Sequence, residues 1–232
     1  MTMKKESQGN MYPWAKPWNP LGGKCPHDCS YCSTNSLRRY PIINEKYSGE
    51  LGLTDSLFKL PKKEERMIFV CAQNDLFAKD VPDIMIKMVL HQCLNHPQHK
   101  YFFQTKNPFR YATFLSHIPK GSILCTTIET NRWYPEIMRA APYTDRRALG
   151  MNRIDSFEKE VTIEPILDFD LDEMVSLIRF CNPTKVNIGA DSKNNHLPEP
   201  SKEKLLALID ELKKFTVIDK KTNLERILCQ KQ

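Results

Sequence analysis

Short apolar runs alternate with longer amphipathic segments over most of the chain. Short apolar runs are typical of buried strands, whereas apolar residues spaced three and four apart are typical of helices. On this basis, strands are predicted at Met67–Cys71, Tyr101–Thr105, Ser122–Ile128, Arg147–Met151, Val161–Leu167 and Lys185–Gly189. Helices are predicted at Pro82–Asn95, Pro108–His117, Tyr134–Ala140, Leu171–Phe180 and Ser201–Phe215, the last with Ser201 as its N-cap.

This alternation of strand and helix predicts an α/β protein with a parallel sheet and right-handed crossovers. About six such units in one domain indicate a partial or complete (β/α)6-type barrel. In such folds the chemistry takes place on the loops that follow the C-terminal ends of the strands. We therefore expect the polar residues after each strand to converge on one mouth.

The polar segment 1–17 contains two prolines and is expected to form a tail or a wrapping arm, and residues 18–232 are expected to form one domain. The net charge of +6 permits a nucleic-acid partner without requiring one. No apolar run approaches the roughly 20 residues of a membrane span, and the N-terminal segment lacks the apolar core of a signal peptide. A cytoplasmic protein without a membrane partner is expected.

Three of the eight cysteines, Cys25, Cys29 and Cys32, form the pattern C-x3-C-x2-C. In a reducing compartment the cysteines are not expected to form disulfides, and the others, Cys71, Cys93, Cys125, Cys181 and Cys229, are expected to be core or incidental residues. A structural zinc site needs four protein ligands, and His27 lies too close in sequence to serve comfortably as the fourth. A [4Fe–4S] cluster held by three cysteines leaves one iron open to a small molecule. A zinc site and redox thiols remain the alternatives.

The cysteine spacing, with Tyr31 directly before the last cysteine, resembles the hallmark of the radical S-adenosylmethionine (SAM) superfamily. The resemblance implies a radical SAM barrel, with Cys25, Cys29 and Cys32 as ligands of a [4Fe–4S] cluster and SAM bound to the open iron. It further implies cleavage of SAM to a 5′-deoxyadenosyl radical, with electrons from a donor such as flavodoxin or ferredoxin.

Further elements resemble a group of phage and prophage proteins that is distantly similar to spore photoproduct lyase. These elements are Trp18-Asn19-Pro20, Asp75-Leu76-Phe77, Thr105-Lys106-Asn107-Pro108, Ile163-Glu164-Pro165 and Gly189. The resemblance implies a location in the host cytoplasm if the protein is phage-encoded, and a modified DNA base as a natural target.

The polar residues after the predicted strands are of types that suit SAM. The expected SAM-binding residues are Tyr31, Gln73, Asn74, Asp75, Thr105, Lys106, Thr127, Glu129, Asn131 and Glu164. Residues 73–75 offer acceptors for the SAM ammonium, Lys106 could pair with its carboxylate, and residues 127–131 could bind ribose hydroxyls. Helix capping by Asp75, a solvated Lys106 and a structural ion pair of Glu164 with Arg147 or Arg153 are the alternatives.

The substrate is not specified by the sequence, although aromatic and basic residues are interleaved in residues 37–47 and 129–147. Such a composition could stack and hold bases or could simply be solvated. We expect an electropositive rim of Arg38, Arg39, Arg132, Arg146 and Arg147, with Tyr40, Trp133 or Tyr134 available for stacking. The alternatives are a non-enzymatic zinc or Fe–S module that binds nucleic acid, and a radical SAM enzyme acting on a small molecule or peptide.

Overall fold

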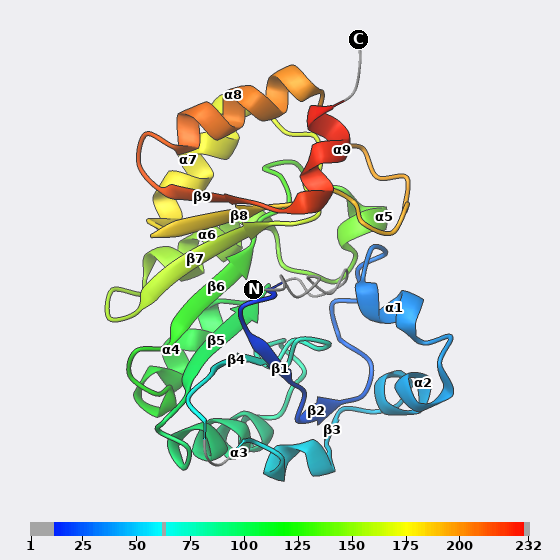
Figure 1. Cartoon of the computed structure of the whole chain (residues 1–232), viewed down its shortest axis with the longest axis vertical. Coiled ribbons are helices and arrows are strands. Elements are labelled where there is room, and N and C mark those ends of the chain that lie inside the picture. The colour runs from blue at the N-terminus through cyan, green and yellow to red at the C-terminus, as the bar shows by residue number, and fades with distance from the viewer. Residues whose placement is uncertain (1–11, 62–63, 230–232) are drawn as a thin grey trace, which may run out of the picture.

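The computed structural model describes residues 12–61 and 64–229 and contains, within these ranges, a seven-stranded sheet in the order β1-β4-β5-β6-β7-β8-β9. Every neighbouring pair in this sheet is parallel (Figure 1). The strands are β1 (Lys16–Trp18), β4 (Met67–Val70), β5 (Lys100–Thr105), β6 (Ile123–Thr127), β7 (Glu158–Ile163), β8 (Lys185–Ile188) and β9 (Val217–Lys220). β2 (Leu21–Gly22) and β3 (Gly52–Leu53) form a separate antiparallel pair. The predicted α/β fold with a parallel sheet is confirmed.

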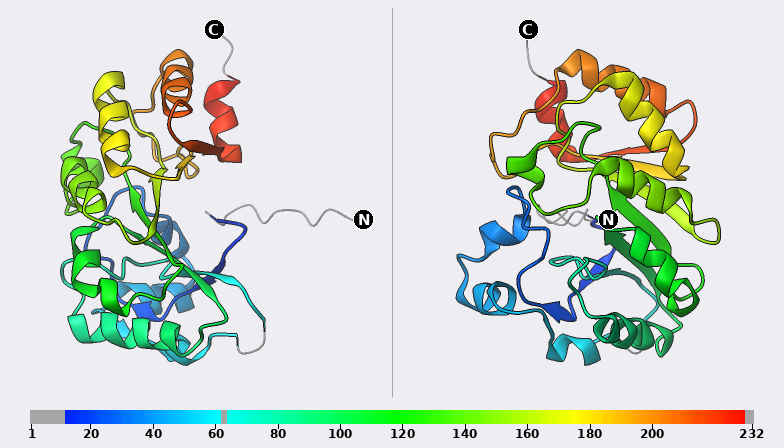
Figure 2. Two further views of the ribbon diagram at one scale, coloured as in Figure 1. Left: turned by 90° about the vertical axis from the view of Figure 1, so that its left-hand side faces the viewer. Right: turned by 180° about the vertical axis from the view of Figure 1, so that it is seen from behind.

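Within the described ranges β9 does not pair with β1, so the sheet is a partial barrel rather than a closed one. Five helices lie together on one side of it, as Figure 2 shows. They are α3 (Asp83–Leu94), α4 (Phe109–Phe114), α6 (Thr144–Asn152), α7 (Leu171–Cys181) and α8 (Lys202–Leu212). The other described helices are α1 (Ser33–Leu37), α2 (Pro41–Ser48), η1 (Asp55–Phe58), η2 (Leu115–His117), α5 (Pro135–Met138), η3 (Thr222–Leu224) and α9 (Glu225–Leu228).

The two faces of the sheet have different compositions because successive strand side chains point to opposite sides. Apolar residues such as Phe103, Leu124 and Val161 face the helices and join the main core. On the inner face, β7 and β8 carry polar residues, and Asn187 donates from Nδ2 to Glu160 Oε2 at 2.9 Å. The inner face therefore provides polar groups below the strand ends.

Residues 12–17, expected to be a tail or arm, take part in the fold. Tyr12 is fully buried against Phe69 and Phe102 on the inner face, and its hydroxyl donates to Gln104 Oε1 at 2.9 Å. Strand β1 begins at Lys16, which pairs with Ile68. The packed domain thus extends before residue 18, while the rest of the expected tail lies outside the described residues.

One predicted strand was wrong, because residues 147–151 lie in helix α6. The buried residues of this segment include Thr144, Arg147, Ala148 and Met151, which have the spacing of one helix face. The strand predicted at 161–167 also begins earlier, at Glu158, and ends at Ile163 before Pro165. The remaining predicted helices and strands occur with shifted ends. No helix in the described ranges is long and apolar enough to cross a membrane.

Candidate cofactor site

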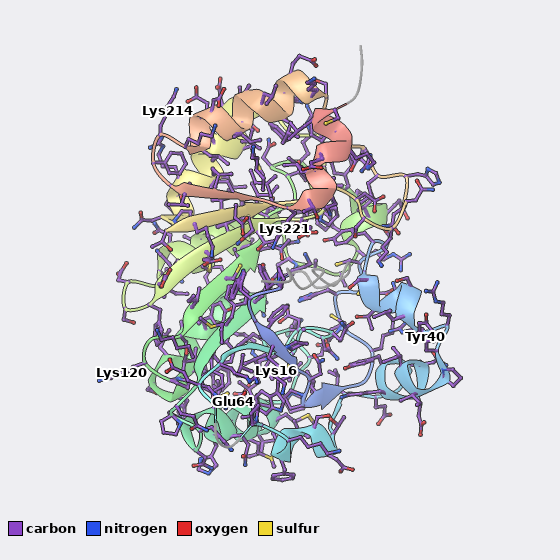
Figure 3. All side chains as sticks on the ribbon, in the orientation of Figure 1. Lys16, Tyr40, Glu64, Lys120, Lys214 and Lys221 are labelled. Atoms are coloured by element: carbon purple, nitrogen blue, oxygen red, sulfur yellow. The ribbon has the colours of Figure 1, made fainter. Side chains whose placement is uncertain are left out.

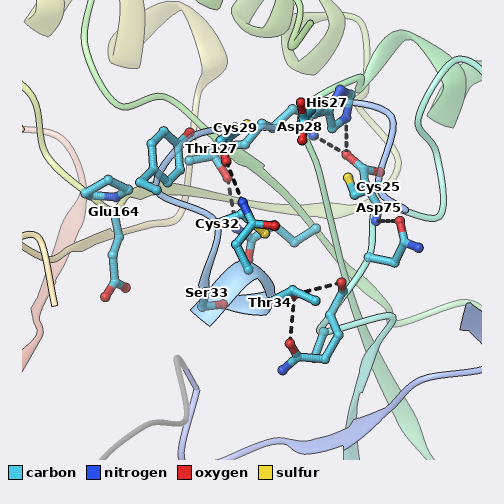
Figure 4. Close-up of a pocket in the computed structure, with 18 of the residues that line it drawn as sticks. Cys25, His27, Asp28, Cys29, Cys32, Ser33, Thr34, Asp75, Thr127 and Glu164 are labelled. Carbon is cyan, nitrogen blue, oxygen red and sulfur yellow. Dashed lines mark hydrogen bonds and ion pairs between the residues drawn. The ribbon is translucent and has the colours of Figure 1, made fainter. Parts of the chain in front are cut away.

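The cysteine loop, residues 25–32, follows the first strands and leads directly into α1. Two tight turns shape it, since Asp28 N donates to Cys25 O and Cys32 N donates to Cys29 O. All three cysteines have free thiols and line one cavity of about 190 Å³ (Figure 4). This volume is well above the 10–15 Å³ or so that a single water requires, so the cavity has room for a larger ligand.

The other walls of the cavity come from the C-terminal ends of five strands. The predicted residues that line it are Tyr31, Gln73, Asn74, Asp75, Thr105, Lys106, Thr127 and Glu164, together with the three cysteines. The loop after β8 contributes Asp191 and Ser192. Glu129 and Asn131 do not line the cavity. Asn131 instead donates to Glu173 on α7 at 2.6 Å.

Asp75 connects the cysteine loop to the ends of β4 and β5. His27 Nε2 lies 2.7 Å from Asp75 Oδ2, which also accepts from Thr105 Oγ1 at 2.9 Å and from Lys106 N at 2.8 Å. Oδ1 accepts from Phe77 N at 2.9 Å. Burial would raise the pKa of Asp75, but His27 and these hydrogen bonds hold it below its ordinary value. Asp75 therefore already has a structural role, with three partners on Oδ2 and one on Oδ1, and its binding of the SAM ammonium stays a prediction.

The two residues before Asp75 also make structural contacts. Asn74 donates to Gly23 O at 2.9 Å and accepts from Asp75 N at 2.8 Å. The Thr34 hydroxyl donates to Gln73 O at 3.0 Å and to Gln73 Oε1 at 2.9 Å. Residues 73–75 were predicted to bind the cofactor. In the structure, Gln73 and Asn74 also form hydrogen bonds that hold the segments on either side of the cysteines.

Glu129 is the centre of a buried charged network. Its carboxylate is fully buried and accepts hydrogen bonds from Tyr31 and Lys106 on Oε1 and from Arg147, at 2.7 Å, on Oε2. Burial would raise the pKa of Glu129, but Arg147 and Lys106 hold it far below its ordinary range. The Lys106 ammonium also lies 5.3 Å from the centre of the Tyr31 ring. Glu129 therefore anchors residues of the cavity wall instead of facing the cavity.

Glu164 lies across the cavity from the cysteines (Figure 4). Neither alternative arginine partner is found, because Arg147 binds Glu129 and Arg153 lies over Phe109. Glu164 Oε1 instead accepts from Asn223 Nδ2 at 3.1 Å. Within the described residues Glu164 Oε2 is buried without a hydrogen-bond partner. Burial raises the pKa of this carboxyl group, although Lys221 partly opposes the effect.

Gly189 and Asn223 hold the Glu164 side chain in place. A Cβ atom at Gly189 would lie 2.6 Å from Glu164 Cδ, so only glycine leaves room for this packing. Asn223, in η3, also donates to Ala190 O at 2.9 Å and accepts from Ala190 N at 3.2 Å. No sequence pattern indicated Asn223, since it lies 59 residues from Glu164 and follows a strand that was not predicted.

Fewer of the five arginines expected in an electropositive rim are available to bind a substrate than the sequence suggested. Arg147 is fully buried and cannot contribute, while Arg132 forms ion pairs with Asp168 and Asp170. Arg39 remains exposed, with its guanidinium 5.0 Å from the centre of the Tyr40 ring. Figure 3 shows Tyr40 at the outer edge of the molecule, beside α2.

The proposed stacking residues and the remaining basic side chains are placed as follows. Trp133 packs against Tyr143, with ring centres 4.3 Å apart. The hydroxyl of Tyr134 contacts Asp168 O at 3.4 Å. Arg38 lines the cavity and donates to Tyr47 O at 2.7 Å, and Arg146 lies over Phe109. These side chains do not form one continuous basic surface.

A search of curated proteins gave no match. Among solved structures, the chain is similar to a double mutant of spore photoproduct lyase with bound AdoMet and dinucleoside spore photoproduct. The TM-score is 0.54 and the identity 12%, over 87% of this chain and 61% of that chain. The likeness therefore concerns the fold, which is shared with a radical SAM enzyme, and this chain spans only 61% of the neighbour's length. Residues 13–222 match the family described as "Protein of unknown function (DUF5131)", and the chain belongs to that family.

Proposed function

We propose that this protein is a radical SAM enzyme in which Cys25, Cys29 and Cys32 hold a [4Fe–4S] cluster. The observation that carries the proposal is that these three free thiols line the same cavity as polar residues from five strand ends. The similarity of the fold to that of a radical SAM enzyme supports it. The bound cluster would supply the electron that cleaves SAM to methionine and a 5′-deoxyadenosyl radical.

The arrangement of the thiols fits a cluster better than a zinc ion. Within residues 12–61 and 64–229, no three Cys, His, Asp or Glu side chains are already grouped as in a metal site, whether for zinc or for a cluster. A four-coordinate zinc needs its ligands to converge on a single point, whereas in a cluster each thiolate binds a different iron. Three cysteines that line one cavity can each bind one iron of a cluster, whereas a structural zinc ion would still lack its fourth ligand.

Three side chains of the cavity have donors or acceptors that no other described residue uses, and these groups match parts of SAM. The Lys106 ammonium has three donors and is held by Glu129, so it can still donate to a carboxylate. Thr127 lines the cavity and already accepts from Gln104 Nε2 at 2.9 Å, which leaves its hydroxyl proton for another acceptor. The unpartnered oxygen of Glu164 can accept from an amino or hydroxyl group.

We further propose a nucleic-acid base or its appended side chain as the substrate, with phage DNA modification as one setting. Support comes from the net charge of +6, from exposed Arg39 beside Tyr40 and from the dinucleoside bound by the structural neighbour. The proposal includes a cytoplasmic location, the host cytoplasm for a phage protein, and a flavodoxin or ferredoxin as electron donor. A flat response of duplex binding to salt would contradict the polymer substrate and favour a small molecule or peptide.

The test begins with anaerobic reconstitution and analysis of iron, sulfide and SAM cleavage. We expect about four irons per chain and slow formation of 5′-deoxyadenosine under dithionite. Separate alanine substitutions of Cys25, Cys29 and Cys32 should each remove the iron, whereas Cys93→Ala, in the core, should not. Stoichiometric zinc with no iron would contradict the enzyme and favour a non-enzymatic nucleic-acid-binding module.

A further inference from the structure

Arg147 is a fully buried arginine that binds Thr127 and Glu129 beside the candidate cofactor site, while its Nη2 has no hydrogen-bond partner among the described residues. From α6, its Nε donates to Pro142 O at 2.7 Å and its Nη1 donates to Thr127 O at 2.9 Å. The same Nη1 binds Glu129 Oε2 at 2.7 Å. The guanidinium thus fixes the end of β6 and the orientation of one carboxylate.

The opposite oxygen of that carboxylate reaches the cavity wall. Glu129 Oε1 accepts from the Tyr31 hydroxyl, in the cysteine loop, and from the Lys106 ammonium, at the end of β5. Tyr31 lies between Cys29 and Cys32 in the sequence. One buried carboxylate therefore links α6, β5 and the cysteine loop, and Glu129 itself lies 98 residues from Tyr31 in the chain.

The arginine determines whether this link is rigid. A guanidinium presents several donors in a fixed plane, whereas an ammonium is a point charge on a flexible stem. Among the described residues, Arg147 supplies the hydrogen bond to Glu129 Oε2. Without the guanidinium, this oxygen would lose that bond, and the carboxylate could rotate toward the Lys106 ammonium. Rotation would release the Tyr31 hydroxyl, which is one of the contacts that hold the cysteine loop.

We infer that Arg147 is a positioning residue, which through Glu129 holds Tyr31 and the cysteine loop in place before any metal binds. The inference rests on the proposed function only in taking that loop as the cluster-binding loop. A plain structural role of Arg147 would lower the stability of the whole molecule evenly. A positioning role would instead loosen residues 25–32 in particular.

The test uses the full-length, reduced, metal-free chain, and measures thiol labelling by mass spectrometry and hydrogen exchange of residues 25–35. Arg147→Lys keeps the charge but removes the fork, and Tyr31→Phe removes only the hydroxyl that binds Glu129. Tyr134→Phe is the matched control, because its hydroxyl contacts Asp168 O and not the cysteine loop. Labelling of buried Cys93 reports global opening in every variant.

We expect Arg147→Lys and Tyr31→Phe each to accelerate labelling of Cys29 and Cys32 about tenfold or more, the factor expected from losing one charged hydrogen bond. Since both changes open the same link, the double variant should be no faster than the faster single variant. Two results would overturn the inference. One is an unchanged labelling rate at Cys29 and Cys32, and the other is an equal rise in the labelling rate at Cys93. If Arg147→Lys fails to fold, Tyr31→Phe and Glu129→Gln decide the question by the same criteria.

This experiment is independent of the proposed enzyme function because no cluster and no SAM are present. A chain that never binds iron could still show the selective loosening of the loop. Conversely, a chain that cleaves SAM but whose loop does not loosen in the variants would retain its enzyme function without a positioning role for Arg147.

Discussion

Replacing Asp75 with asparagine should destabilise the protein by about 2–3 kcal/mol at neutral pH. The carboxylate accepts three hydrogen bonds on Oδ2 and one on Oδ1. An asparagine amide has only one acceptor oxygen, so its NH2 group must face at least one donor. Leaving one buried donor unpaired costs roughly 1–3 kcal/mol, and the remaining bonds lose the strengthening that a charged acceptor gives.

Urea unfolding at pH 7, followed by far-UV circular dichroism, measures this loss. With a denaturant slope of about 2 kcal/mol per molar, the midpoint should fall by roughly 1 M relative to the parent. Asp80→Asn is the matched control, because Asp80 is exposed in the same strand-to-helix connection. Equal midpoints for the parent and Asp75→Asn would refute the structural role assigned to this carboxylate.

The same variant has a characteristic pH dependence. The folded-state pKa of Asp75 lies below its ordinary value of 3.8, so the stability that its charge contributes is complete above pH 3.8. That contribution is lost as the pH falls through the folded-state pKa. The difference between the parent and Asp75→Asn should therefore shrink in acid, and a difference that stays constant down to pH 2 would contradict the assignment.

Three further outcomes follow from the cavity wall opposite the cysteines and from the last long helix. Gly189→Ala should cost about 1–3 kcal/mol through overpacking, and Glu164→Ala should relieve most of this cost, as a thermodynamic cycle of urea midpoints would reveal. Glu164→Gln should gain stability relative to the parent as the pH rises above 4.5 through the raised folded-state pKa, whereas a pH-independent difference would contradict the burial of the carboxyl group. Ser201→Ala should cost about 1 kcal/mol, because the Ser201 hydroxyl caps α8 by accepting from Lys204 N, and an unchanged unfolding midpoint would argue against the cap.

The sequence predicted the sheet and the convergence of its strand ends because both depend on local patterns. A short apolar run gives a buried strand, and parallel strands bring their C-terminal ends to one edge. This reasoning placed Gln73, Lys106 and Thr127 on one cavity with the cysteines, as the structure has them. Gly189, one of the elements that carried the resemblance, lies where the Glu164 side chain packs against the backbone.

The parts that were not predicted depend on contacts between distant segments. Residues 147–151 are apolar enough to resemble a short strand. Their buried positions follow the spacing of a helix only when Arg147 is counted as buried, which depends on its ion pair with Glu129. A buried arginine carries no apolar signal, so a hydrophobicity pattern misreads it. Residues 1–17 were expected to form a tail or a wrapping arm, and the packing of Tyr12 was not predicted, since its partners on β4 and β5 lie more than 50 residues away.

The nearly sequential order of the main sheet has a consequence for biosynthesis. From β4 onward, each strand pairs with the one made just before it, so the sheet can grow at one edge as the ribosome proceeds. The cysteines emerge early, but the segment that holds the opposite wall of the cavity, with Asn223 and Arg226, emerges last. A nascent or truncated chain would thus have the three thiols in a half-built and open cavity. The proposed cluster would therefore meet exposed cysteines if it were loaded before translation ends, and a finished cavity if it were loaded afterwards.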